Sequence, residues 1–255
     1  MKKKYILLVC AILITGVAGF VVYRVMGSLD RIVKSGVETF GPEITQADVR
    51  LENVDVDLSS GKLAMDGLLI GNPKGFETAQ ALKLDQISVK MDLSTLTKDP
   101  IVIEEILIQA PAVTYELAGN GSNLDALTKN IDAYTGAGKK EKEKSEGPKL
   151  LIKDLYIRNG EINVSMKGLK GKALSSPLPD IHMRDIGKKT GGATPGEVAR
   201  AVMDKIRAGT GTAVSRLDLG KLTGTASGTL KAAGDAVKSG VESVGGALKG
   251  LFDKD

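Results

Sequence analysis

The sequence contains few of the residues on which most metal sites and catalytic sites depend. Its 255 residues include one cysteine (Cys10), one histidine (His182) and no tryptophan, and aromatic residues make up 4%. A structural zinc site needs several Cys or His ligands, so a site of that kind is excluded. A single cysteine also excludes an intrachain disulfide, and a catalytic triad would have to use His182.

The charges are nearly balanced and interleaved along the chain. Lys and Arg number 35 against 31 Asp and Glu, which gives a net charge of +4. A nucleic-acid surface needs a concentrated basic stripe, so we expect no nucleic-acid partner. No Gly-rich stretch has the spacing of a nucleotide-binding loop. We therefore expect a structural, binding or transport role, with no catalytic residue, no metal and no cofactor.

Three groups of side chains keep a chemical role open as an alternative. The pairs Glu104-Glu105 and Asp55 with Asp57 have the chemistry for acid–base work or Ca²⁺ binding, but their strand context favours solvated carboxylates. His182 could sense pH, but it falls on the polar side of an alternating segment. We expect an ordinary surface residue there.

The N-terminus has the pattern of a membrane anchor. Lysines at positions 2–4 precede an uncharged run over residues 5–23. As a helix this run would span roughly 28 Å, close to the roughly 30 Å of the hydrocarbon core of a bilayer. The lysines predict a cytoplasmic N-terminus and an exported body, so residues 1–27 form a stub and a single-pass anchor. A signal peptide cleaved near residue 19 is the alternative, and a lipoprotein processed at Cys10 is a weaker one.

Hydrophobic periodicity divides the rest of the chain. Residues 28–42 predict a short amphipathic helix that Gly41-Pro42 ends. Residues 43–190 alternate apolar and polar positions, which is typical of half-buried antiparallel strands. Within them, residues 122–135 predict a helix capped by Ser122, and residues 136–148 a charged linker.

One eight-residue pattern recurs in the strand region. Two alternating apolar residues are followed by two polar residues and then by two more alternating apolar residues. The copies are VRLENVDV (49–56), LKLDQISV (82–89), IVIEEILI (101–108) and LLIKDLYI (150–157), with a partial copy IHMRDI (181–186). A β-bulge at each polar pair would keep all four apolar residues on one face and curve the sheet into a trough. In the alternative, the second apolar pair faces a second core.

Three further segments complete the organisation. Asn159-Gly160 between two apolar runs predicts a two-residue β-hairpin. Residues 194–208 predict a helix that opens with a capping box and a proline. Residues 209–255 are rich in glycine, yet their aliphatic residues follow a helical stripe. This tail is either an amphipathic helix that contacts anionic lipid or a disordered segment.

The segment from residue 36 to residue 132 resembles the N-terminal part of AsmA-like proteins. The resemblance rests on VKSGVETFGPEIT, LENVDVDLSSGKLAMDGLLIGNPKGF, LKLDQISVKMDLSTL, DPIVIEEILIQAPAVTYEL and GSNLDALTKNI. These proteins are inner-membrane-anchored relatives of TamB and of the bridge-like lipid-transfer superfamily. The resemblance implies a β-groove in the periplasm, a role in lipid homeostasis of the bacterial envelope, and no catalytic motif.

These observations together lead to one functional hypothesis and one alternative. We expect a non-enzymatic, membrane-anchored protein that handles phospholipid through an apolar β-groove. The residues expected to face the acyl chains are Val54, Val56, Ile87, Val89, Ile106 and Ile108. In the alternative, helices cover this face of the sheet, and the chain is a structural or interaction protein of the envelope. Whether the apolar face is open distinguishes the two.

Overall fold

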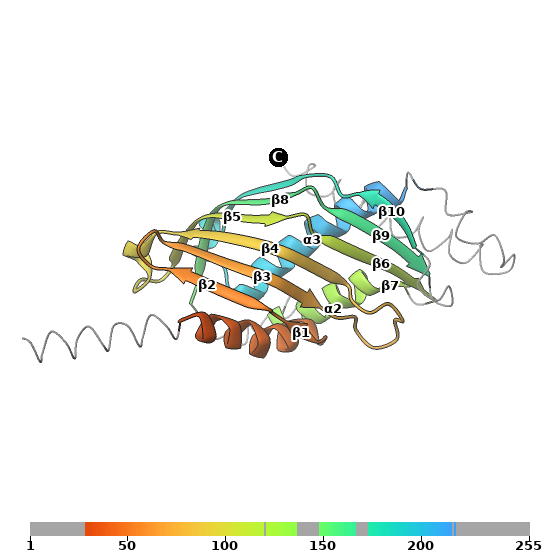
Figure 1. The fold of residues 1–255 in the computed structure, drawn as a ribbon, viewed down its shortest axis with the longest axis horizontal. Helices are drawn as coiled ribbons and strands as arrows, with labels where there is room; N and C mark the ends of the chain where they lie inside the picture. Colours follow the sequence, from red (N-terminus) through yellow and green to blue (C-terminus); the bar gives the residue numbers. More distant parts are fainter. Residues whose placement is uncertain (1–28, 120, 137–147, 167–172, 216, 218–255) are drawn as a thin grey trace, which may run out of the picture.

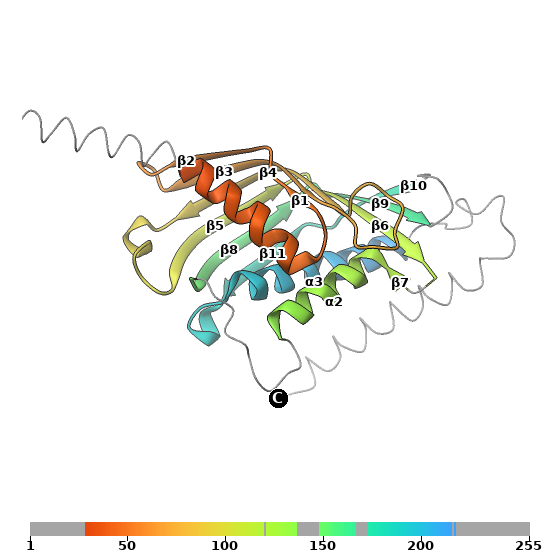
Figure 2. The same ribbon diagram turned by 90° about the horizontal axis from the view of Figure 1, so that it is seen from below.

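The body of the protein is a single β-sheet with helices on one side. The computed structural model describes residues 29–119, 121–136, 148–166, 173–215 and 217. In Figure 1 the strands lie in front of the helices, and Figure 2 shows the helices side by side beneath the sheet. The predicted fold class, mainly β with accessory helices, is confirmed for the body.

Several predicted segments fall wholly or mostly in the parts of the chain that the structure does not describe. The anchor of residues 1–27 and most of the linker and tail, residues 137–147 and 218–255, lie outside the described residues. Among the described residues, no helix is both long enough and apolar enough to span a bilayer.

Eleven strands form the sheet in the described part of the chain. They are β1 (Val49–Arg50), β2 (Asn53–Asp57), β3 (Lys62–Ile70), β4 (Leu82–Met91), β5 (Ile101–Gln109), β6 (Ala112–Ala118), β7 (Gly121–Ser122), β8 (Leu150–Arg158), β9 (Glu161–Met166), β10 (Ala173–Pro177) and β11 (Ile181–Ile186). The helices are residues 29–45, α2 (Asn123–Thr135) and α3 (Pro195–Val214), with short 3₁₀ turns η1 (Leu93–Thr95) and η2 (Lys188–Thr190).

The sheet is mixed, which corrects the prediction of a purely antiparallel sheet. β5 pairs with β8, and β6 with β9, in parallel, whereas the other pairs are antiparallel. The chain leaves β6, forms α2 and then returns to start β8 beside the start of β5. Because β8 starts beside the start of β5, the two strands run in the same direction, and the crossover through α2 supplies the long connection that parallel strands need.

Pairs of named strands join into longer runs that keep one register. β1 and β2 pair with β3 in a single register. In the same way β6 continues β5, β9 continues β8 and β11 continues β10, and both members of each run keep one register with the neighbouring run. The breaks fall in one row across the sheet. The register of the neighbouring pairs aligns this row as Glu52, Gly67, Asp85, Ala110, Asn159 and Pro179.

At this row each strand changes phase, that is, the set of alternate residues that faces the core shifts by one position. Three residues of the row have a positive φ: Gly67 (66°), Ala110 (47°) and Asn159 (54°). In β4, for example, Leu82 and Leu84 are buried before the row, and Ile87 and Val89 after it. The polar pair between them is exposed. The expectation that all four apolar residues of the motif share one face is therefore confirmed. Opposite strands shift together, so their register is preserved.

A second row of irregularities crosses only part of the sheet. Glu104, Lys153 and Asp185 lie beside one another, and none of them takes part in a regular pair. β4 has no matching irregularity, so its register with β5 shifts by one residue between Lys90 and Met91. This is the bulge that the motif predicted at Glu104-Glu105.

The prediction of a hairpin at Asn159-Gly160 is wrong. β8 pairs with β5 and β11, β9 pairs with β6 and β10, and the two do not pair with each other. Asn159 takes the left-handed conformation, and a Cβ on Gly160 would lie 2.9 Å from Leu178. The dipeptide that suits a tight turn here serves the kink of a continuing strand.

The helices partly follow the predicted bounds. The first helix continues through Gly41-Pro42 to residue 45, so Pro42 does not end it. The predicted capping boxes at Ser122 and Thr194 are both present. α3 runs to Val214, beyond the predicted end at residue 208 and into the segment assigned to the tail.

Candidate functional site

The six residues predicted to face lipid lie in the core of the body. Val54, Ile87, Val89 and Ile108 are 5–9% exposed. Val56 and Ile106 are half-buried and pack against the same hydrophobic cluster. That cluster also contains Met203 and Ile206 of α3, and Val33 and Val37 of the first helix pack against it. At these positions the apolar face of the sheet is therefore a packed core beneath helices.

The first helix is fixed to the edge strand β1–β2 by a ladder of polar side chains. Asp30 and Glu38 accept hydrogen bonds from the backbone N–H groups of Val56 (3.0 Å) and Leu51 (3.1 Å). Lys34 Nζ donates to the carbonyl oxygen of Glu52 at 2.9 Å. The three side chains are spaced four residues apart, so they follow one side of the helix. They satisfy backbone groups that an edge strand otherwise leaves unpaired.

Two ion pairs join the helices α2 and α3. Arg200 pairs with Asp132 of α2 and also with Asp204 on its own helix, and Arg207 pairs with Asp125. Asp125 also belongs to the capping box of α2. These contacts join α3 to α2, and buried Met203 and Ile206 of α3 pack into the core.

A buried carboxylate holds the loop of residues 71–81 against the sheet. Glu116 is fully buried, and it accepts the backbone N–H groups of Glu77 and Thr78, both at 2.7 Å, and the hydroxyl of Thr78 at 2.5 Å. Asn123 donates to Asn72 Oδ1 at 2.7 Å, and Asn72 donates to the carbonyl oxygen of Thr78 at 2.6 Å. Each partner is a backbone group or a short side chain, so the network is structural.

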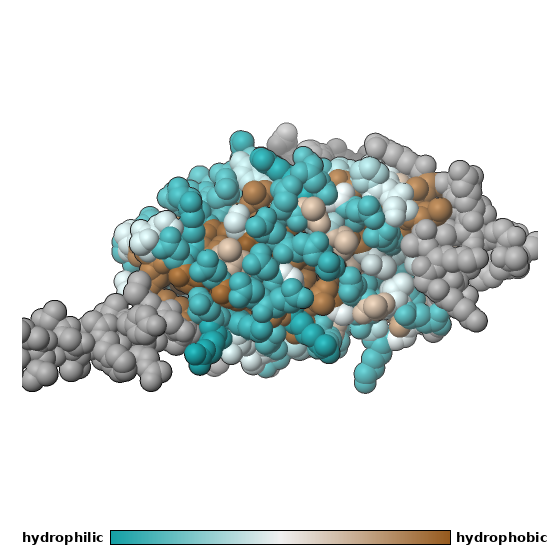
Figure 3. Space-filling view, viewed as in Figure 1, coloured by the Kyte–Doolittle hydropathy of each residue, from teal (hydrophilic) through white to brown (hydrophobic). Residues whose placement is uncertain are grey.

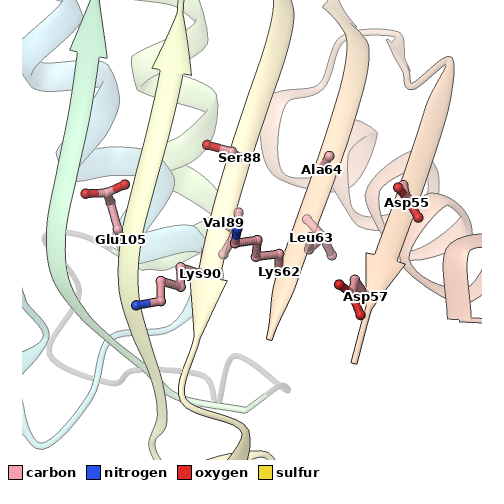
Figure 4. A pocket seen from close by; sticks show the side chains of 9 residues that line it. All are labelled: Asp55, Asp57, Lys62, Leu63, Ala64, Ser88, Val89, Lys90 and Glu105. Carbon is pink, nitrogen blue, oxygen red and sulfur yellow. The ribbon is translucent and has the colours of Figure 1, made fainter. Parts of the chain in front are cut away.

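The outward face of the sheet, away from the helices, is mostly hydrophilic, with some hydrophobic residues visible between the hydrophilic ones (Figure 3). A hollow of about 470 Å³ opens on it. Ala64 and Ser88 pair across β3 and β4, and their small side chains leave space above the strands. The hollow is lined by Asp55, Asp57, Lys62, Leu63, Ala64, Ser88, Val89, Lys90 and Glu105 (Figure 4).

The charges around the hollow are of both signs, and Asp57 and Lys90 contact neighbouring side chains. Lys90 Nζ lies 2.8 Å from Glu104 Oε2, and this contact raises the pKa of Lys90 and lowers the pKa of Glu104. Hydrogen bonds from Ser59 and Ser60 lower the pKa of Asp57 to about 2. These carboxylates stay ionised at neutral pH, so the hollow suits a charged or polar group of a partner better than a proton-transfer reaction.

A stacked cluster lies on the same outward face, over β8 and β11. The rings of Tyr156 and His182 stack with centroids 4.2 Å apart, and the Arg158 guanidinium lies 4.6 Å from the Tyr156 centroid. His182 Nε2 lies 2.7 Å from Asp154 Oδ1, and Arg184 Nε lies 3.6 Å from the same oxygen. His182 is exposed, as expected. No serine or cysteine nucleophile takes part in these contacts.

The structure separates the acidic pairs that kept a metal site open as an alternative. Asp55 and Asp57 lie on β2, and Glu104 and Glu105 lie on β5, with β3 and β4 between these two strands. Within the described ranges, no group of three or more His, Cys, Asp or Glu side chains has an arrangement that could hold a metal ion.

Sequence reasoning missed the hollow and the stacked cluster. The register gives the signal that was missing: Asp55, Ala64, Ser88, Leu107, Tyr156 and His182 form one continuous row across six strands. Two small residues on adjacent strands make a depression only if they are neighbours, and neighbours are known only once the pairing is known.

The chain matches no family model and no curated protein. The resemblance to AsmA-like proteins therefore stays a prediction based on the five sequence segments.

Proposed function

We propose that this protein is a non-enzymatic component of the bacterial envelope, held at the inner membrane by residues 5–23, whose periplasmic body binds partner proteins. One observation carries the proposal. Most of the apolar face of the sheet is packed beneath the chain's own helices: Val54, Ile87 and Ile108 are at most 7% exposed, whereas Val56 and Ile106 are half-buried. What the body offers a partner is then its outward face and its edges.

The closed face also has an energetic consequence. Each fully buried aliphatic side chain contributes roughly 1.5–3 kcal/mol, so helices that cover this face supply much of the stability of the body. An acyl chain that entered between the sheet and these helices would replace helix contacts of similar chemistry. The outward hollow between β2 and β5 needs no such replacement, because it is already open and lined by charged residues.

The proposal is tested on the body from residue 28 onward, prepared without detergent. We expect no stoichiometric phospholipid by mass spectrometry, and we expect Val89→Glu and Ile106→Glu each to unfold the body as seen by circular dichroism. Lys90→Glu is the matched control, because Lys90 neighbours Val89 in sequence but is exposed. A folded Val89→Glu variant would contradict a closed core.

Phospholipid handling is the second candidate function, and one feature favours it. Val56 and Ile106 are only half-buried, and Asp30, near the start of the described helix, contacts β2 at Val56. The helix is tied to the edge strand by three polar side chains, so its release would open the face to an acyl chain. Bound phospholipid that Val89→Glu abolishes, with the β-sheet dichroism retained, would favour this function over the first.

The location is part of the same proposal and has its own test. The anchor reading requires residues 5–23 to remain in the mature protein. Mass spectrometry of the native protein should detect Tyr5 and Val22, and a mature N-terminus near Phe20 would instead indicate a cleaved signal peptide.

The tail beyond residue 217, which lies outside the described residues, is proposed to contact anionic lipid.

A further inference from the structure

The two edges of the sheet differ in how their backbone groups are satisfied. At the β1–β2 edge, Asp30, Lys34 and Glu38 of the first helix occupy the outward N–H and C=O groups. The opposite edge is the run of β10 and β11. Across the part of the chain that the structure describes, no hydrogen bond reaches the backbone of β11 from the side away from β8.

The direction of those backbone groups follows from one backbone hydrogen bond and from the alternation of residues along a strand. Leu178 faces the core, and its N–H donates to the Gly160 carbonyl at 2.8 Å, so core-facing residues of this run point their N–H groups into the sheet. Met183 of β11 packs against the core and follows the same rule. His182 and Arg184 alternate with it, so their N–H and C=O groups point away from the sheet.

The side chains of β11 specify what kind of strand would fit there. Ile181, Met183 and Ile186 are half-buried at the rim of the core, whereas His182 and Arg184 are exposed on the outward face. A strand added at this edge places its side chains beside these residues. Aliphatic residues would cover the core rim. Carboxylates on the alternate positions would lie near Arg184, whose side chain is 72% exposed although its Nε lies 3.6 Å from Asp154.

A second copy of the chain does not fit this edge. The β1–β2 edge of another copy is already covered by its own helix of residues 29–45. If two β11 edges paired about a two-fold axis at Arg184, the two Arg184 side chains would lie opposite each other, and like charges directly opposite in paired strands are destabilising.

We propose that β11 is a docking edge for an extended segment of a partner protein in which aliphatic and acidic residues alternate. The proposal rests on the interaction function above and names its partner class. The chain's own β2 shows the pattern at the opposite edge: Val54 and Val56 face the core, and Asp55 is exposed on the outward face. The added strand would gain main-chain hydrogen bonds from the edge and specificity from its alternate side chains.

The test measures binding of the fluorescein-labelled peptide acetyl-Val-Asp-Val-Asp-Val-Asp-amide to the full chain in detergent, by fluorescence anisotropy, with empty micelles as the blank. We expect saturable binding that weakens as salt increases. The same peptide with lysine in place of aspartate should not bind. A peptide N-methylated at the residues whose N–H groups face β11 should lose binding, and one methylated at the other residues should keep it.

Two variants separate the edge from the rest of the surface. Arg184→Glu should weaken binding by about tenfold or more, which corresponds to about 1.4 kcal/mol. Arg50→Glu makes the same substitution on an exposed residue of β1, at the opposite edge of the sheet, and should have no effect. His182→Pro removes an outward N–H that no ladder bond uses, so it should abolish binding while the thermal unfolding curve stays cooperative.

The outcomes that overturn this proposal differ from those that overturn the proposed function. Absence of binding, equal binding of the lysine peptide, or indifference to N-methylation would each refute strand addition at β11. None of these results bears on whether the apolar face is closed, which the lipid analysis and Val89→Glu decide. Conversely, a body that carries lipid yet binds the peptide would remove the first function and leave the docking edge.

Discussion

Replacement of Glu116 by glutamine would test how a buried carboxylate holds a surface loop. The carboxylate accepts three hydrogen bonds from Glu77 and Thr78, and it is 0% exposed. Glutamine has the same shape but one acceptor oxygen, and its NH₂ group would face donors. Hydrogen bonds to a charged group contribute about 1.5–3 kcal/mol each, so we expect Glu116→Gln to lower the free energy of unfolding by about 3 kcal/mol or more.

Thermal unfolding by circular dichroism gives the first measurement. For a body of this size, 1 kcal/mol corresponds to about 2–4 °C, so the melting temperature should fall by roughly 6–12 °C. Limited trypsin digestion gives the local measurement, because exposed Lys74 lies in the same loop and should be cleaved faster. Glu105→Gln changes an exposed glutamate on β5 and should leave both measurements unchanged.

A double-mutant cycle with Thr78→Val shows whether the effect belongs to this contact. The valine removes the hydroxyl that donates to Glu116 and that also accepts from Asn72 Nδ2 at 2.7 Å. If Glu116 acts through Thr78, the two substitutions together should destabilise less than the sum of their separate effects. A Glu116→Gln variant that melts within 2 °C of the parent protein, with unchanged cleavage at Lys74, would refute this account.

Three further outcomes follow from other contacts. Gly67→Ala should lower stability by about 1–2 kcal/mol in urea denaturation, because Gly67 has a φ of 66° and an added Cβ would lie 2.6 Å from Glu52. Gly36→Ala is the control: an added Cβ there has no atom within 4 Å, so this substitution should not lower stability. The pKa of Asp57 is lowered from 3.8 to about 2 in the folded state, so its carboxylate stabilises the fold above this pH range and loses that effect as the pH falls through it. Asp57→Asn should therefore lose less stability than the parent protein between pH 3.8 and about 2. Arg207→Ala should reduce stability by about 0.5–1.5 kcal/mol, and the difference from the parent should shrink in 1 M salt, because the ion pair with Asp125 is partly exposed.

Local signals in the sequence predicted the elements that depend on neighbouring residues. The capping boxes at Ser122 and Thr194 each involve residues three apart, and both are present. The polar pair of each motif marked the change of phase because every strand needs one face buried. β3 holds a further copy, with Leu63 and Met65 before Asp66-Gly67, that sequence reading missed because glycine does not read as polar.

Features that depend on distant segments could not be predicted in this way. Whether β8 pairs with β5 in parallel depends on the path of the chain after α2, and no short motif encodes that path. The cover over the apolar face is similar, because the periodicity of residues 29–45 gives an amphipathic helix but not the surface it packs on. Asn159-Gly160 shows the converse, since its preference for a left-handed conformation suits a hairpin or a kink equally well.

The shared row of phase changes has a consequence for how this architecture can vary. An insertion of one residue in a single strand would move the side chains on one side of the insertion to the opposite face of the sheet, so the length of each strand is tightly restricted. A complete strand that carries its own polar pair at the same level meets no such penalty. Descendants of this sheet should therefore differ in the number of strands far more than in the length of any one strand, and an alignment of them would show gaps as multiples of a whole repeat.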